Sequence, residues 1–249
     1  MVVIFAVIAV ISLNSGTTET AVNEKETDTE TKAESDSESL TIFNLGGITL
    51  SSYNASTGMA GDVLFSKNGL DAARGQESIF YMFGQRLPKN NADEPQRINP
   101  NFEFRGITKP IDLIAAIDGI VIDIKEQSGS SDVELFIVPS ENSNWVVGYD
   151  HITDVVVEKG QTVKAGQKLG VVAKESSGDY RYELQINNNA TDTMHCPTTL
   201  LDPSVKTLLG TQITKLASDW TAWYGKDVFG AHTDGCLKPS ITAAESEGR

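Results

Sequence analysis

The sequence predicts a mostly β protein with one amphipathic helix near its C-terminus. Short runs of β-branched residues follow one another between residues 119 and 186. Turns rich in glycine, serine or asparagine separate most of these runs, and they leave no room for the crossover helices of a parallel sheet. Apolar residues with helical spacing form a long segment only after residue 200. Together these patterns predict antiparallel strands followed by a helix.

Four runs in the middle of the chain are expected to be strands. They are GIVIDIKEQ (119–127), DVELFIVP (132–139), WVVGYDHI (145–152) and KLGVVAKE (168–175). Each has the length and the β-branched composition of a strand.

A fifth run, DYRYELQI (179–186), alternates strictly between polar and apolar residues. Alternate side chains of a strand point to opposite faces of the sheet. One face should therefore carry the polar set, and the other should pack on a core. The polar set is Asp179, Arg181, Glu183 and Gln185, and the apolar set is Tyr180, Tyr182, Leu184 and Ile186.

Two glycine turns punctuate the stretch VVVEKGQTVKAGQKLGVV (155–172). Gly160 and Gly166 supply backbone conformations that a side chain would penalise, so each Gly-Gln pair predicts a tight turn between short strands. This turn pair is typical of the barrel-sandwich hybrid, or duplicated hybrid motif, fold. Biotinyl and lipoyl carriers, efflux-pump adaptors and lysostaphin-like zinc endopeptidases share that fold.

The flanking segments resemble the lysostaphin-like endopeptidases. LIAAIDGIV (113–121) resembles their V-x-A-x-x-D-G-x-V strand, and the segment 149–170 resembles their Y-x-H-L…V-x-x-G-x-x-V-x-x-G-Q-x-I-G pattern. FGQRLP (83–88) is similar to their F-G-x-R, and YEL (182–184) to their F-E-V. The resemblance runs from about residue 83 to residue 186. A carrier domain is disfavoured because the chain has no M-K-M-type hairpin, and an adaptor because it has no heptad run.

The resemblance implies a zinc site whose ligands this sequence lacks. The family holds zinc through H-x-x-x-D and the second histidine of H-x-H. Here Asn99 and Glu103 keep the first spacing, while Asp179 and Arg181 fall on the H-x-H pair. A guanidinium has no lone pair to give a metal. Only His151, at the family's catalytic Y-x-H histidine, remains.

We therefore expect a domain without zinc, without another cofactor and without peptidase activity. Asp179, Arg181 and Glu183 should form an ion-paired polar patch in the former metal groove, with His151 facing it. The resemblance implies a binding or regulatory role at the cell wall, with peptidoglycan or a cell-envelope protein as partner. Two alternatives stay open. One is an active zinc metalloendopeptidase, a peptidoglycan hydrolase, with atypical ligands; the other is an adaptor or carrier-like binding module.

The net charge and the N-terminal segment lead us to expect an extracytoplasmic protein that does not bind nucleic acid. The net charge of −14 disfavours nucleic acid and anionic membrane surfaces as partners. Residues 1–13 are apolar, as in a signal peptide or the end of a membrane anchor, and provide the one expected membrane contact. The acidic segment 14–40 predicts a disordered linker. We expect a lead-in at 41–100, the peptidase-type β domain at 101–190, and the helix and tail at 191–249.

The C-terminal part should be fastened by a disulfide. Cys196 and Cys236 are the chain's two cysteines, an even number that suits an exported protein. A metal site using both cysteines with His195 and His232 is the competing interpretation. Between the cysteines, Asp202 and Pro203 predict a helix start and Gly225 its end. The expected apolar stripe of this helix comprises Val205, Leu208, Leu209, Ile213, Leu216, Trp220 and Trp223.

Overall fold

A computed structural model describes residues 39–68, 70, 77–89, 91–127, 131–175 and 178–248. The predicted signal or anchor segment 1–13 and all but the last two residues of the predicted linker 14–40 lie outside these residues. Residues 39–249 group into a single compact unit.

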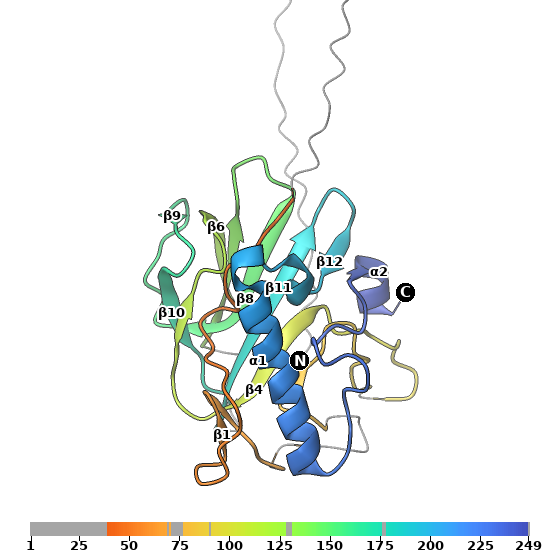
Figure 1. Cartoon of the computed structure of the whole chain (residues 1–249). Helices are drawn as coiled ribbons and strands as arrows, with labels where there is room; N and C mark the ends of the chain where they lie inside the picture. Colours follow the sequence, from red (N-terminus) through yellow and green to blue (C-terminus); the bar gives the residue numbers. More distant parts are fainter. Residues whose placement is uncertain are drawn as a thin grey trace, which may run out of the picture. The chain divides into compact units, whose positions relative to one another are not determined.

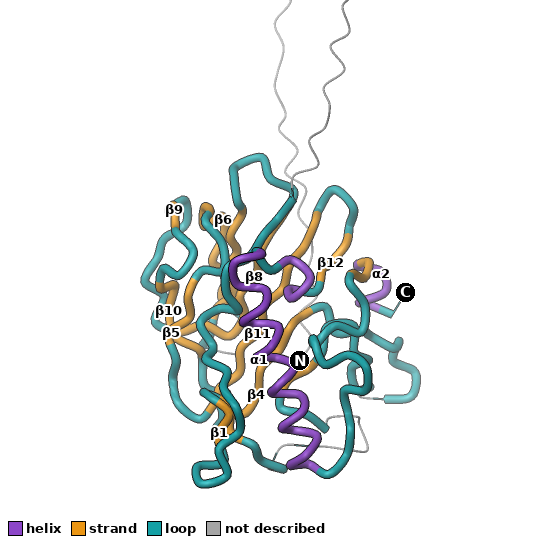
Figure 2. Tube along the Cα trace, in the orientation of Figure 1, coloured by secondary structure: helices purple, strands orange, loops and turns teal. Residues whose placement is uncertain are grey.

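Antiparallel strands dominate the described residues (Figures 1 and 2). The longer ones are β4 (Asn101–Ile107), β6 (Gly119–Glu126), β7 (Val133–Val138), β8 (Trp145–Thr153), β10 (Lys168–Val172) and β11 (Tyr180–Asn188). The shorter ones are β1 (Met59–Ala60), β2 (Val63–Leu64), β3 (Phe80–Tyr81), β5 (Asp112–Ile114), β9 (Thr162–Val163), β12 (Thr193–His195) and β13 (Ser240–Thr242). The helices are a 3-10 turn (Pro197–Leu200), α1 (Pro203–Tyr224) and α2 (Ala243–Glu247). The predicted mostly β fold with a C-terminal helix is confirmed.

Strand β11 lies in the middle of the sheet, whose main order is β1-β2-β4-β11-β8-β7-β6-β9. Its neighbours are β4 on one side and β8 on the other. In this register Glu183 of β11 is opposite Glu103 of β4 and also opposite Asp150 of β8. Like charges directly opposite one another destabilise a sheet unless they are compensated. The cationic side chains that compensate these carboxylates form the candidate site.

The two glycine turns form as predicted. Gly160 has φ +87° and Gly166 has φ +85°. Nothing lies within 4 Å of where a Cβ would stand at either position, so the glycines are needed for their backbone conformation and not for space. The Gly160 N–H donates to the Val121 carbonyl, and the Gly166 N–H to the Ala115 carbonyl, which ties both turns to the β5–β6 region.

Helix α1 begins and ends where the sequence predicts. The Asp202 side chain accepts the Ser204 N–H, Pro203 occupies the first turn, and Gly225 ends the helix with φ 82°. Figure 1 shows α1 passing in front of β4, β8 and β11. Its buried residues are Ile213, Leu216, Ala217 and Trp220. The predicted stripe is wrong at Leu208, which is 62% exposed, whereas Val205 and Leu209 in the same turns pack against the core. Among the described residues, no helix has the length and apolarity to cross a membrane.

Residues before the β domain contribute to the same hydrophobic core as its strands. Phe80 of β3 packs on Phe102 of β4 with ring centroids 5.5 Å apart, and both side chains are fully buried. Phe65 meets Trp220 of α1 edge-on at 5.1 Å, and the Trp220 Nε1–H donates to the Glu77 carbonyl at 3.0 Å. The Trp-bearing side of α1 therefore packs on the lead-in segment.

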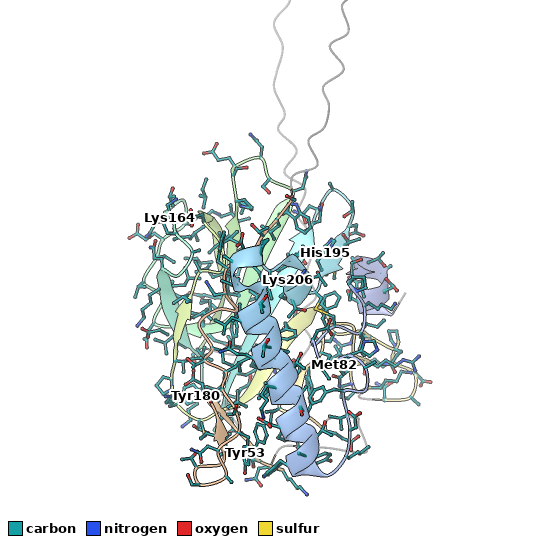
Figure 3. All side chains as sticks on the ribbon, viewed as in Figure 1. Tyr53, Met82, Lys164, Tyr180, His195 and Lys206 are labelled. Carbon is teal, nitrogen blue, oxygen red and sulfur yellow. A yellow bond between two sulfur atoms is a disulfide. The ribbon has the colours of Figure 1, made fainter. Side chains whose placement is uncertain are left out.

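The predicted disulfide is confirmed. Cys196 and Cys236 are bonded with their Cα atoms 6.0 Å apart, which joins the segment after β12 to the segment before β13. Because both thiols are consumed by this bond, the competing metal site with His195 and His232 is ruled out. Figure 3 labels His195, which lies on β12.

Candidate functional site: a carboxylate cluster around His151 and Arg181

Much of the polar face of β11 is buried. Glu183 is 6% exposed and Gln185 is 8% exposed, while Glu103 of the adjacent strand β4 is 4% exposed. Burying a charge without a partner is expensive, so each of these carboxylates requires one. Arg181, Arg105 and His151 provide the partners.

Arg181 directs its guanidinium at three carboxylates. Its Nη2 donates to Glu183 Oε1, its Nε lies 3.2 Å from Glu103 Oε1, and its Nη1 lies 3.5 Å from Glu175 Oε1. Arg105 adds a second cation, with Nε donating to Glu103 Oε1 at 2.6 Å. Burial opposes the charge on Arg181, but the carboxylates outweigh it and raise its pKa further above the usual range. Arg181 is thus a permanent internal cation.

His151 faces the same cluster from β8 in an unusual backbone conformation. Its φ is +64°, a left-handed value that is strained for a residue other than glycine. Its Nδ1 lies 2.6 Å from Asp132 Oδ2, while Nε2 lies 3.5 Å from Glu183 Oε1 and 3.6 Å from Asp150 Oδ2. Burial lowers the pKa of His151, but Glu183 and Asp150 outweigh that effect and raise it to about 9.

Burial and the neighbouring charges shift the pKa values of the carboxyl groups in different directions. Burial raises the pKa of Asp150 to about 7. Burial also favours the neutral form of Glu183, but Arg181 and His151 outweigh it and lower the pKa of Glu183 to about 2. The pKa values of Glu103 and Glu134 are raised, chiefly by burial. The cluster therefore holds more carboxyl groups than its cations can keep ionised.

The structure brings most of the predicted site residues together but not all. Arg181, Glu183 and His151 meet as expected. Asp179 does not join them: it precedes β11, and it is exposed. Strand alternation holds only inside the strand, and the β4–β11 pairing shifts register between Tyr180 and Tyr182, so the expectation for Asp179 was wrong.

Sequence reasoning missed Asp132, Glu134, Asp150 and Glu175 as members of the cluster. Asp132 stands directly before β7, and Asp150 directly precedes His151 on β8. The sequence signal for Asp150 was the run YDHI, in which this carboxylate directly precedes the one histidine of the matched segment. The pairing that brings β7 beside β8 was needed to place Asp132 against the imidazole.

The residues at the family's zinc positions do not fit zinc. Asn99 is buried, and its amide nitrogen donates to the carbonyls of Met82 and Asn101 at 3.2 and 2.9 Å. Arg181 falls at the position where the resemblance calls for an imidazole, and Glu103 is paired with two arginines. Zinc is held by neutral imidazole, thiolate and carboxylate ligands, and a guanidinium among them excludes it. No zinc-dependent step follows from these residues.

One known family matches the β domain. Residues 107–193 match the description Peptidase family M23. No curated protein matches the chain.

Solved structures that are similar to the chain include proteins of this family. Lysostaphin in solution is 17% identical, with 37% of each chain covered and a TM-score of 0.33. The chain therefore spans little more than a third of lysostaphin's length. The catalytic domain of the prophage-encoded M23 protein EnpA from Enterococcus faecalis is 18% identical, covers 45% of this chain and 82% of its own, and has a TM-score of 0.32. A chain of the SpoIIQ–SpoIIIAH pore-forming complex is 15% identical over 66% of this chain and 97% of its own, with a TM-score of 0.39.

The profile match covers the strands that carry His151, Arg181 and Glu183 as well as both glycine turns. Residues 107–193 are thus similar to peptidase family M23.

Proposed function

We propose that this domain is a non-hydrolytic, extracytoplasmic binding module that uses the M23 fold to bind peptidoglycan. The observation that carries the proposal is the position of Arg181, whose guanidinium pairs with Glu103, Glu175 and Glu183. Activation of water by zinc requires three protein ligands and an open coordination position. A permanent cation fixed among the carboxylates opposes a metal ion at that place.

Two further features support export. The apolar segment 1–13 has the length of a signal-peptide core. The Cys196–Cys236 bond is of the kind that persists in oxidising compartments outside the cytoplasm. A protein that acts on or binds the cell wall would be found there.

Co-sedimentation with purified peptidoglycan, combined with mass spectrometry of the supernatant, tests the proposal. We expect the protein to pellet with the peptidoglycan and to release no peptide-cleaved fragments, with or without added zinc. Release of fragments that stops when EDTA is added would establish the alternative, an active metalloendopeptidase. Failure to pellet, with no cleavage, would reject peptidoglycan as the ligand and leave a cell-envelope protein as the partner to seek.

A matched pair of variants locates the binding. Glu175→Lys reverses one charge beside Arg181, where Glu175 is 31% exposed in its side chain. Glu126→Lys makes the same change at an exposed position of β6. Loss of sedimentation with the first variant alone assigns the former metal groove as the binding surface, whereas equal loss with both variants assigns the effect to overall charge.

A further inference from the structure

We propose that a polar cavity beyond the C-terminal end of α1 binds an N-acetylated sugar of the glycan strand. The cavity has a volume of about 280 Å³ and is lined by Glu77, Ser78, Gln85, Lys226, Asp227 and Val228. Lys226 directly follows Gly225, the residue that ends α1. None of these six residues belongs to the cluster around His151 and Arg181. The choice of a peptidoglycan sugar as the ligand rests on the proposed function, whereas the cavity itself does not.

The side chains around the cavity are held in place by contacts with α1 and with the turn that follows it. The Trp220 Nε1–H donates to the Glu77 carbonyl at 3.0 Å, and the Tyr224 hydroxyl donates to Glu77 Oε1 at 3.2 Å. Asp227 Oδ1 accepts two backbone N–H groups of the next turn, at 3.0 and 2.9 Å. A site that is already ordered loses little conformational entropy when a ligand binds, which favours affinity.

Lys226 and Asp227 retain hydrogen-bonding capacity for a ligand. The Lys226 ammonium donates to both oxygens of Glu77, at 2.8 and 2.7 Å, and its third N–H remains available. Within the described part of the chain, the two N–H groups that Asp227 binds both donate to Oδ1, so Oδ2 can accept from a ligand. Both residues are exposed, so a ligand in the cavity can reach them.

A donor beside an acceptor selects an uncharged ligand that carries hydroxyl groups. Glu77 and Lys226 neutralise each other, and Asp227 leaves the cavity with one net negative charge. An anion would be repelled by Asp227, and an amine could not accept from Lys226 because an ammonium has no lone pair. Adjacent hydroxyls of a sugar both donate and accept, and they can therefore bind both side chains at once.

The balance of polar and apolar groups also fits a sugar. Five of the six lining residues are polar, and Val228 provides the one apolar side chain. Pockets for drug-like small molecules are instead lined mainly by hydrophobic and aromatic side chains. A pyranose ring presents hydroxyls along its edge and C–H groups on its faces, so Val228 can contact a face while Lys226 and Asp227 bind the edge. N-Acetylglucosamine is the uncharged sugar that peptidoglycan offers.

Titration of the isotope-labelled protein with a soluble oligomer of N-acetylglucosamine, followed by NMR chemical shifts, tests the site. We expect saturable shift changes centred on residues 226–228. Lys226→Met and Asp227→Asn should each weaken binding by about 10-fold, which corresponds to one hydrogen bond to a charged group. Lys206→Met makes the same change in the first turn of α1 and is the matched control, whose affinity should be unchanged (Figure 3). The dispersion of the NMR spectrum verifies that each variant is folded.

Four results would each overturn the proposal. They are the absence of saturable binding at millimolar sugar, shift changes centred on the polar face of β11, an affinity that neither cavity variant lowers, and an equal loss of affinity in Lys206→Met. If Lys226→Met unfolds the protein, the test rests on Asp227→Asn, whose Oδ1 keeps the turn. Sedimentation with peptidoglycan by a protein that binds no oligosaccharide refutes this inference alone. Oligosaccharide binding at the cavity without sedimentation refutes the proposed function and leaves the sugar site standing.

Discussion

Strand β11 has two buried faces that are stabilised in different ways. Tyr182, Leu184 and Ile186 are fully buried in the apolar core, where each contributes through the area it removes from water. Arg181, Glu183 and Gln185 are buried or nearly so on the opposite face, where burial itself is unfavourable and each charge depends on a partner. On the apolar face, the stability lost in a substitution should grow with the side-chain volume removed. On the polar face, removal of a single charge should lower the stability by itself.

The largest effect is expected on the polar face. Arg181→Met keeps the side-chain length but leaves Glu183, Glu103 and Glu175 without their shared cation. We expect the free energy of unfolding, measured by urea denaturation, to fall by about 3–5 kcal/mol. The double variant Arg181→Met/Glu183→Gln should recover part of this loss. A fall of less than about 1 kcal/mol in the single variant would mean that the guanidinium is not a structural cation.

On the apolar face, Leu184→Ala should lower the free energy of unfolding by about 3 kcal/mol through lost burial and a cavity. Because no charge is involved, the loss should be the same in low and high salt. A strong salt dependence would show that the charges on the polar face of β11 also determine how much the apolar face contributes to stability.

The pH dependence of stability should reveal His151. Its pKa is 6.5 in an unfolded chain and about 9 in the folded protein. A raised pKa means that the charged imidazole stabilises the fold, fully below pH 6.5 and no longer once the pH has risen through 9. In metal-free protein with EDTA, stability should therefore fall by at most about 3 kcal/mol over this range. His151→Gln should lack this loss, and an identical pH profile in that variant would refute the assignment.

The smallest effect is expected at an exposed ion pair, which serves as the reference for the buried ones. Lys164, labelled in Figure 3, lies 2.7 Å from Asp118, and its side chain is 74% exposed. Solvent screening leaves such a pair with little net energy. Lys164→Ala should not change the unfolding midpoint measurably. A clear destabilisation would mean that surface pairs on the glycine turns matter more than their exposure implies.

The sequence predicted the elements of the fold better than the membership of the site. Local sequence patterns predict the strands, the turns at Gly160 and Gly166 and the caps of α1. The number of cysteines predicts the Cys196–Cys236 bond. The membership of the cluster depends on which residues face one another across β4, β7, β8 and β11. This register cannot be read from the sequence of a single strand. Asp179 and Asp132 illustrate this: a shift in register excludes the first, and a neighbouring strand brings in the second.

The most direct test is a crystal structure of the protein grown with zinc, with anomalous scattering measured at the zinc edge. The account predicts no anomalous peak between Asn99, Glu103 and Arg181, and a guanidinium paired with Glu103 and Glu183. A zinc peak at that place, with Arg181 turned away from both glutamates, would contradict the claim that an internal cation has replaced the metal.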